Sequence, residues 1–236
     1  MTVESISEIV ERVSLAMVAN SKREVMQEPT EEMCQKWRDE VVRRTDQLNR
    51  KIGRRYQDAT LENYRTETIE QTTAVKILQD YARNIRENIA AGCGIVLFGP
   101  SGTGKDHLFA GLAKVAITRG ICPMWINGVD LHALMRDAIQ QDLRETSVIE
   151  PLAKAELLVL SDPLPPSGVL NDYQTATMYR LIDQRYKNML PVWCSLNVAD
   201  GNEARSRIGA ATVDRLIDGT LSIECKWKSY RRKRGQ

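Results

Sequence analysis

The chain has 236 residues, of which 42% are hydrophobic and 27% are charged. This composition excludes a disordered chain, a fibrous repeat and a small protein held together by disulfides, and it provides enough apolar material for one sizeable core. The 33 basic and 31 acidic residues leave a net charge of only +2, so any contact with nucleic acid must use local basic patches.

The cysteines and the N-terminus bear on the cell compartment. No CxxC pair occurs, and neither histidine has a metal-like spacing to a cysteine, which favours reduced thiols and argues against a zinc site. No secretory signal and no run of about 18 apolar residues is visible in the sequence. We therefore expect a cytoplasmic protein.

An apolar seam near the N-terminus predicts a first, amphipathic helix. Its members recur every three or four positions: Val3, Ile6, Val10, Val13 and Met17. Ser5 and Glu8 have the spacing of a capping box near the start of this helix. So narrow a seam is buried either on the chain's own domain or against a partner helix.

A second helix is expected to begin at Pro29-Thr30, with the proline in its first turn and with Met33, Trp37 and Val41 on one face. A basic stretch that includes a single acid, Asp46, follows: Arg43, Arg44, Arg50, Lys51, Arg54 and Arg55. This stretch is either a solvated face or a contact for phosphates or an acidic partner. We expect residues 1–58 to form a helical N-terminal region that binds a partner.

From about residue 60 the pattern changes to apolar strands that alternate with amphipathic helices, which predicts a parallel α/β sheet. Strands are expected at residues 94–98, 121–126, 156–161, 191–197 and 221–225. Helices are expected at 72–90 and at 172–188, the latter with Met178, Leu181, Ile182 and Tyr186 on one face. A proline-rich loop at 163–168 lies at the carboxyl edge of the sheet, where α/β proteins bind their ligands.

The strongest functional signal is a glycine-rich turn between the strand at 95–98 and the next helix. Glycines let backbone N–H groups surround a phosphate, the helix N-terminus adds positive potential, and Lys105 reaches the β- and γ-phosphates. The usual pattern has Ser or Thr after this lysine, whereas this chain has Asp106. We expect ATP binding here rather than a relic loop, at Gly99, Pro100, Ser101, Gly102, Thr103, Gly104, Lys105, Asp106 and His107.

A second signal is the end of the strand at 156–161. ATPases with such a phosphate-binding turn usually carry two acidic residues at this place. Here Ser161 stands at the position of the metal-organising acid, and Asp162 at that of the catalytic glutamate. As an alternative, Asp162-Pro163 is only a turn that ends the strand. The two departures suggest one exchange, in which the loop supplies the carboxylate of Asp106 and the strand supplies the hydroxyl of Ser161. Since Mg²⁺ accepts both kinds of oxygen, we expect Asp106, Ser161 and Asp162 to organise the metal.

Together, four segments resemble the DnaC-type replicative helicase loaders and the IstB-type transposition ATPases, which are AAA+ proteins. These segments are the glycine-rich loop, residues 60–64 (TLENY), residues 130–137 (DLHALMRD) and the tail Ser229-Tyr230-Arg231. The resemblance spans about residues 60–231. It implies a P-loop domain over 59–236, with a parallel five-stranded sheet flanked by helices and no room for a large C-terminal lid.

The resemblance also implies roles for single residues. Asn197 matches the polar sensor that positions the attacking water, with Ser195 as the alternative, and Arg231 matches the second sensor. Arg215 matches the arginine finger, which acts on a neighbouring subunit and implies self-association. Family members often have another arginine where this chain has Ala211.

Two of these arginines have simpler interpretations. In the simpler interpretation of Arg215, this residue only forms an ion pair on its helix, with Asp214 or Asp218. In that of Arg231, the residue only belongs to a basic tail that is exposed to solvent. For DNA contact, basic residues around Arg136 and Arg144, together with the C-terminal tail, are better candidates than the tryptophans. Of Trp125, Trp193 and Trp227, we expect those on strands to lie in the core rather than to stack on bases.

The resemblance implies a helicase loader that uses ATP, Mg²⁺ and slow hydrolysis to switch its hold on a replicative helicase and on single-stranded DNA. Hydrolysis is expected to be slow because Asp162 is one methylene shorter than glutamate. Two alternatives stay open: an IstB-type helper ATPase for a transposase, and an adaptor to which ATP is bound without useful hydrolysis.

Overall fold

Short apolar runs become the strands of a parallel sheet that is covered on both faces, which is why these runs do not alternate with polar residues. The computed structural model describes residues 30–141, 145–165 and 168–231. Their strands are β1 (Ile95–Phe98), β2 (Pro123–Asn127), β3 (Leu157–Ser161), β4 (Val192–Leu196) and β5 (Leu221–Glu224). All pairings are parallel, in the order β2-β3-β4-β1-β5. The predicted fold class is therefore confirmed.

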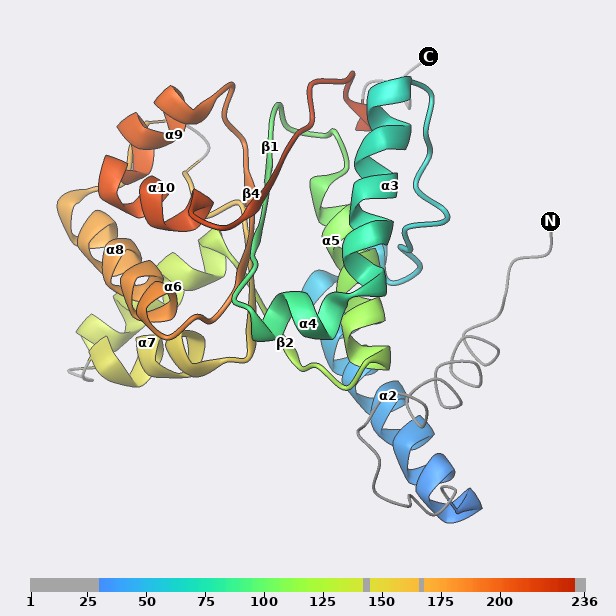
Figure 1. Ribbon diagram of the computed structural model, residues 1–236. Coiled ribbons are helices and arrows are strands. Elements are labelled where there is room, and N and C mark those ends of the chain that lie inside the picture. Colours follow the sequence, from blue (N-terminus) through green and yellow to red (C-terminus); the bar gives the residue numbers. More distant parts are fainter. Residues whose placement is uncertain (1–29, 142–144, 166–167, 232–236) are drawn as a thin grey trace.

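Helices form a layer on each face of the sheet (Figure 1). One layer contains α2 (Glu31–Ile52), the short helix η1 (Arg54–Tyr56), α3 (Ile69–Arg83), α4 (Ile85–Ala90) and α5 (Lys105–Thr118). The other contains α6 (Gly128–Gln140), α7 (Glu145–Lys154), α8 (Asp172–Lys187), α9 (Gly201–Ile208) and α10 (Ala210–Ile217). Successive side chains of β1 point to opposite faces of the sheet. Ile95 and Leu97 therefore join the first core, which lies between the sheet and the α2–α5 layer, and Val96 joins the second core, on the side of α6–α10. Trp125 and Trp193 are buried, as expected, and Trp227 is buried as well.

The helix expected at 72–90 is two helices. It begins at Ile69, because Thr68 and Gln71 form a capping box, and its first part ends at Arg83. Asn84 interrupts it with a non-helical backbone before α4 begins. The apolar pattern continued through this break, and for that reason the prediction missed it.

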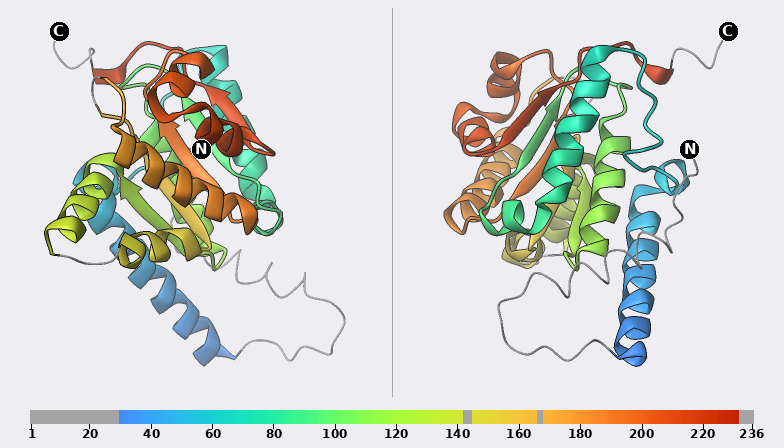
Figure 2. Two further views of the ribbon diagram at one scale, coloured as in Figure 1. Left: turned by 90° about the vertical axis from the view of Figure 1, so that its left-hand side faces the viewer. Right: turned by 45° about the vertical axis from the view of Figure 1, so that its right-hand side comes forward.

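Helix α2 links the N-terminal region to the domain. It begins at Glu31, after Thr30 as N-cap, rather than with the proline in its first turn. Its first turns project away from the domain (Figure 2), so Met33 is 60% exposed, whereas Val41 is 3% exposed. From Val41 to Ile52 the helix packs on α5 and β2 within the first core. The hydrophobic packing therefore continues across the boundary expected after residue 58. The seam at residues 3–17 lies outside the described residues.

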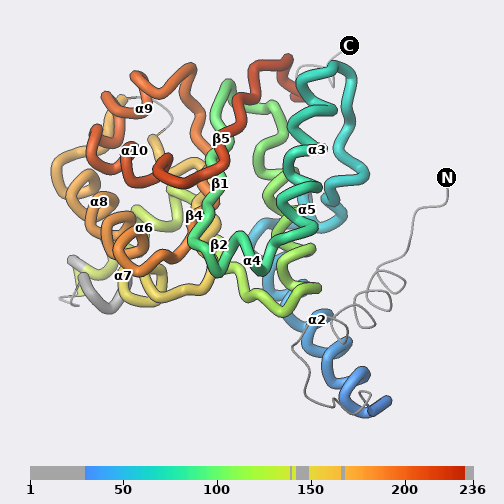
Figure 3. The backbone as a smooth tube through the Cα atoms, viewed as in Figure 1, coloured from blue at the N-terminus to red at the C-terminus, as the bar shows by residue number. Residues whose placement is uncertain are grey.

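After β5, the chain returns to the start of α3, as the backbone trace shows (Figure 3). There the Tyr230 hydroxyl donates to the backbone oxygen of Arg65 and accepts a hydrogen bond from Gln71 at 3.1 Å. The tail is thus fixed beside the turn between β1 and α5. Within the described part of the chain, no helix is both long enough and apolar enough to cross a bilayer.

Candidate functional site

The turn between β1 and α5 has a backbone that requires glycine at three positions. Gly99, Gly102 and Gly104 have φ angles of +138°, +84° and +88°, which L side chains rarely adopt. A Cβ at Gly102 would lie 2.1 Å from the Ser229 Oγ atom, so the tail packs directly on the loop. Gly104 is the N-cap of α5, and the N–H groups of the first helical turn therefore point into the loop.

Lys105 places a cation at the centre of this loop. Its ammonium donates to the backbone oxygens of Gly99 and Pro100, both at 2.8 Å, and contacts the Thr103 hydroxyl at 3.4 Å. The side chain is 6% exposed, and this burial lowers the pKa of Lys105. These hydrogen-bond partners are neutral, so no carboxylate is hydrogen bonded to the ammonium, and this favours an anionic ligand.

Asp106 meets two hydroxyl groups from neighbouring strands. Ser161 donates to its Oδ1 atom at 2.8 Å, and Ser195 donates to the same atom at 3.2 Å. Ser161 and Ser195 are paired in the register of β3 and β4, so both hydroxyls lie at the carboxyl edge of the sheet. The two residues that depart from the usual pattern, Asp106 and Ser161, are thus in direct contact.

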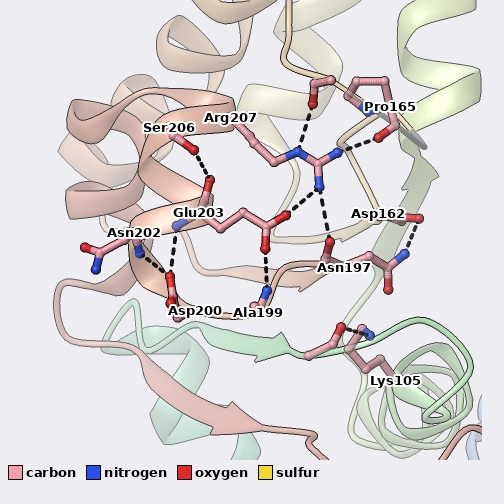
Figure 4. Close-up of polar contacts among 12 residues, drawn as sticks. Lys105, Asp162, Pro165, Asn197, Ala199, Asp200, Asn202, Glu203, Ser206 and Arg207 are labelled. Atoms are coloured by element: carbon pink, nitrogen blue, oxygen red, sulfur yellow. Dashed lines mark hydrogen bonds and ion pairs between the residues drawn. The ribbon is translucent and has the colours of Figure 1, made fainter.

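Asp162 is held in place as well. Its φ of 46° is in the left-handed region, and its amide donates to the Ser195 backbone oxygen at 3.0 Å. Asn197 donates to the Asp162 carboxylate (Figure 4). Burial and the nearby Asp106 carboxylate raise the pKa of Asp162 above its ordinary value. Asp162 is therefore in contact with Asn197, the residue that matches the polar sensor.

Two segments far apart in the sequence hold the loop from outside. Tyr64 donates to the Thr103 backbone oxygen at 2.6 Å, and Trp227 donates to the same oxygen at 2.8 Å. The Tyr230 amide donates to the Gly102 backbone oxygen at 2.9 Å. The sequence motifs at 60–64 and 229–231 indicated this corner, but the sequence analysis assigns no such role to Trp227.

We expect Trp227→Phe to weaken binding of both ATP and ADP by about 2- to 10-fold, because one hydrogen bond that fixes the loop is lost while the aromatic packing is kept. Titration with a fluorescent nucleotide measures this. Trp125→Phe is the matched control, since Trp125 is similarly buried but lies on β2, at one edge of the sheet. Equal affinities of the Trp227→Phe variant and the unaltered chain would contradict the role of this contact.

The candidate residue His107 contacts the segment at residues 60–64. Its Nε2 atom lies 3.0 Å from the Thr60 backbone oxygen and 2.8 Å from Asn63 Oδ1. Both partners accept hydrogen bonds, so this nitrogen carries a proton and binds the segment at 60–64. A contact of His107 with ATP therefore stays a prediction.

The two candidate arginines have different surroundings. Arg215 forms an ion pair at 2.8 Å with Asp183 of α8, and its guanidinium lies 4.8 Å from the centroid of the Tyr179 ring. Its partner is therefore neither Asp214 nor Asp218, and the structure does not bring Arg215 together with the other site residues. Arg231 is exposed, and its Cδ atom lies 3.4 Å from the point that a Cβ at Gly102 would occupy.

Arg207 was not recognised in the sequence. Its guanidinium donates to four groups: the backbone oxygens of Pro165, Gly168 and Asn197, and the carboxylate of Glu203 (Figure 4). Three of these partners are main-chain oxygens, which carry no residue signature. Only Glu203, four positions earlier, could have been read as a partner from the sequence.

The comparisons with known proteins agree with this geometry. The model of the IstB-like ATP binding protein family matches residues 12–236. The chain belongs to this family. Membership implies nucleotide binding, which fits the phosphate loop, the buried lysine and the helix N-terminus described above.

Among the curated relatives of this chain is the replicative helicase loader DnaC of Escherichia coli K12. The two sequences are 26% identical over 180 residues, which are 75% of this chain and 70% of DnaC. A putative insertion sequence ATP-binding protein of Sinorhizobium fredii is 28% identical over 199 residues, which are 80% of this chain and 64% of that protein.

Solved structures show the same fold. A crystal structure of the DnaC helicase loader has a TM-score of 0.64 at 22% identity and covers 73% of this chain and 99% of its own. AMPPCP-bound DnaA from Aquifex aeolicus has a TM-score of 0.57 at 19% identity and covers 73% of this chain and 51% of its own. These likenesses confirm the expected AAA+ fold.

Proposed function

We propose that this protein is a helicase loader that binds ATP and Mg²⁺ at the turn between β1 and α5 and hydrolyses the ATP slowly. The observation that carries the proposal is the assembly at one sheet edge of a phosphate loop with a buried lysine, Lys105, and of the pair Asp106 and Ser161. Residues from three elements, α5, β3 and β4, contribute to this edge.

The donor set fits Mg²⁺. Asp106 and Asp162 offer carboxylate oxygens, and Ser161 and Ser195 offer hydroxyls, which are the hard oxygen donors that this ion prefers. Among the described residues, no three His, Cys, Asp or Glu side chains are grouped so that they could hold a metal ion. The phosphates would therefore share in holding the ion. When bound, Mg²⁺ neutralises charge on the β- and γ-phosphates.

The chain's own groups have separate tasks in this proposal. Lys105 binds the phosphates, and the N–H groups at the start of α5 orient them. Asp162 takes a proton from the attacking water, and Asn197 orients both the carboxylate and the water. Because aspartate is one methylene shorter than glutamate, the water is poorly aligned and turnover is low.

The assignment to helicase loading rests on the likeness to DnaC in sequence and over the whole length of its crystal structure. A second candidate, the helper ATPase of a transposase, is favoured by the family model and by the insertion sequence protein of Sinorhizobium fredii. In either case, the N-terminal region of residues 1–58 contacts the partner protein, and Arg136 and the basic tail contact single-stranded DNA. A role of Arg215 in a neighbouring subunit requires that its side chain leave Asp183.

We expect the full chain to bind the replicative helicase of its own host when ATP and Mg²⁺ are present, and to release it with ADP. Size-exclusion chromatography of the mixture measures this, and Lys105→Ala is the control that removes the phosphate contact. Binding to the transposase of an insertion sequence in place of the helicase would favour the second candidate. Binding to neither protein would contradict the proposal.

Hydrolysis separates a switch from an adaptor that only holds ATP. We expect phosphate release to be slow, to exceed that of Lys105→Ala, and to change when single-stranded DNA is added. A rate equal to that of Lys105→Ala, together with intact ATP binding, would favour the adaptor. DNA binding itself should weaken steeply as salt is raised, because phosphate contacts release counterions.

A further inference from the structure

Arg207 joins three segments at the carboxyl edge of the sheet. It lies in the last turn of α9, and its side chain is only 13% exposed. Nε donates to Gly168 at 2.9 Å, Nη2 donates to Pro165 at 2.6 Å, and Nη1 donates to Asn197 at 3.2 Å, in each case to the backbone oxygen. The guanidinium therefore fastens the loop after β3 to the end of β4.

The charge of Arg207 is balanced on its own helix. Its Nη1 atom lies 3.2 Å from Glu203 Oε1, and Glu203 Oε2 accepts a hydrogen bond from the Ala199 amide at 2.7 Å. Asp200 caps α9 by accepting from the amides of Asn202 and Glu203 at 2.8 and 2.9 Å. Helix α9 is therefore anchored to the end of β4 at its start, and through Arg207 at its end.

The anchored segment includes the contact that matters for hydrolysis. The backbone of Asn197 is held by Arg207, while its side chain donates to the Asp162 carboxylate (Figure 4). Asp162 itself precedes the loop that Arg207 holds at Pro165. We propose that Arg207 is a positioning residue for ATP hydrolysis, which fixes the Asn197–Asp162 pair by tying both of their chain segments to α9.

A lysine could not replace this residue. The three hydrogen bonds start from different nitrogens of the planar guanidinium, whose N–H groups point in fixed directions. The single ammonium of a lysine, on a flexible side chain, cannot reach the same three backbone oxygens in the same directions. The inference rests on the proposed ATPase function but goes beyond it, because Arg207 belongs neither to the phosphate loop nor to the expected sensors.

The test compares Arg207→Met and Arg207→Lys with Arg205→Met in the full chain. Arg205 is the matched control, since it lies two positions earlier on α9 and its ion pair, with Asp214 at 2.8 Å, leads away from the site. We expect both Arg207 variants to lower kcat by about 10- to 100-fold, as a small misplacement of reacting groups does. ATP and ADP affinities, measured by titration with fluorescent nucleotides, should change by less than about 3-fold, because the phosphate loop is untouched.

A double-mutant cycle separates positioning from general stability. If Arg207 acts through Asn197, Arg207→Met should lower kcat little further in a chain that already carries Asn197→Ala. Additive losses, or a parallel loss of ATP and ADP binding, would overturn the inference. So would an Arg207→Lys variant as active as the unaltered chain. Wild-type hydrolysis no faster than that of Lys105→Ala would instead overturn the proposed ATPase function, and the inference with it.

Discussion

Asp106→Thr alone should weaken Mg²⁺-dependent ATP binding by about 10- to 100-fold, whereas the same change combined with Ser161→Asp should restore most of it. The reason is the 2.8 Å contact between the two side chains: together they supply one carboxylate and one hydroxyl, and the double variant supplies the same pair from exchanged positions. Titration calorimetry with ATP, with and without Mg²⁺, measures each affinity.

The controls for this exchange use the same residues. Ser161→Asp alone places two carboxylates in contact, and we expect it to bind ATP less well than the double variant. Without Mg²⁺, the differences between the variants should shrink, since the hydroxyl and carboxylate act on the ion. An affinity of the double variant no better than that of the worse single variant would show that the two departures are unrelated.

Asp162→Asn should lower the rate of ATP hydrolysis by about 100-fold or more, because the amide keeps the shape of the carboxylate but accepts no proton. ATP affinity should fall far less, because the amide still offers an oxygen donor to Mg²⁺. Single-turnover hydrolysis and nucleotide titration give the two values. Asp172→Asn, in the first turn of α8, is a control of equal size and chemistry on the surface. A variant that hydrolyses ATP as fast as the unaltered chain would exclude Asp162 as the base.

The same carboxylate sets the expected pH dependence. Burial and the neighbouring Asp106 raise the pKa of Asp162, so it takes up a proton at a higher pH than an ordinary aspartate. Because the base must be ionised, the rate should fall as the pH decreases through this raised pKa and should level off above it. A rate that stays constant well below neutrality, down to the ordinary pKa of aspartate, would contradict this.

The strands and the phosphate loop could be predicted because their signals are local. The run at residues 95–98 is apolar and is followed at once by glycines and a lysine, and both features depend on neighbours in the sequence. The pairing of Asp106 with Ser161 was inferred from chemistry, since each residue departs from a pattern in a complementary way. The structure places these two side chains in contact.

The parts that could not be predicted depend on distant partners. His107 turns to Thr60 and Asn63, and Arg215 binds Asp183, because the packing of other helices decides these contacts. Arg207 was missed for a different reason: its partners are chiefly backbone oxygens, which every residue carries. The boundary after residue 58 was placed by composition, whereas the packing of α2 depends on the sheet beside it.

The measurement that tests the account most directly is the titration of the full chain with labelled ATP in the presence of Mg²⁺. We expect saturable binding of one nucleotide per chain and its loss in Lys105→Ala. Uptake that does not saturate, or a Lys105→Ala variant that binds ATP as well as the unaltered chain, would mean that the turn between β1 and α5 does not hold a nucleotide.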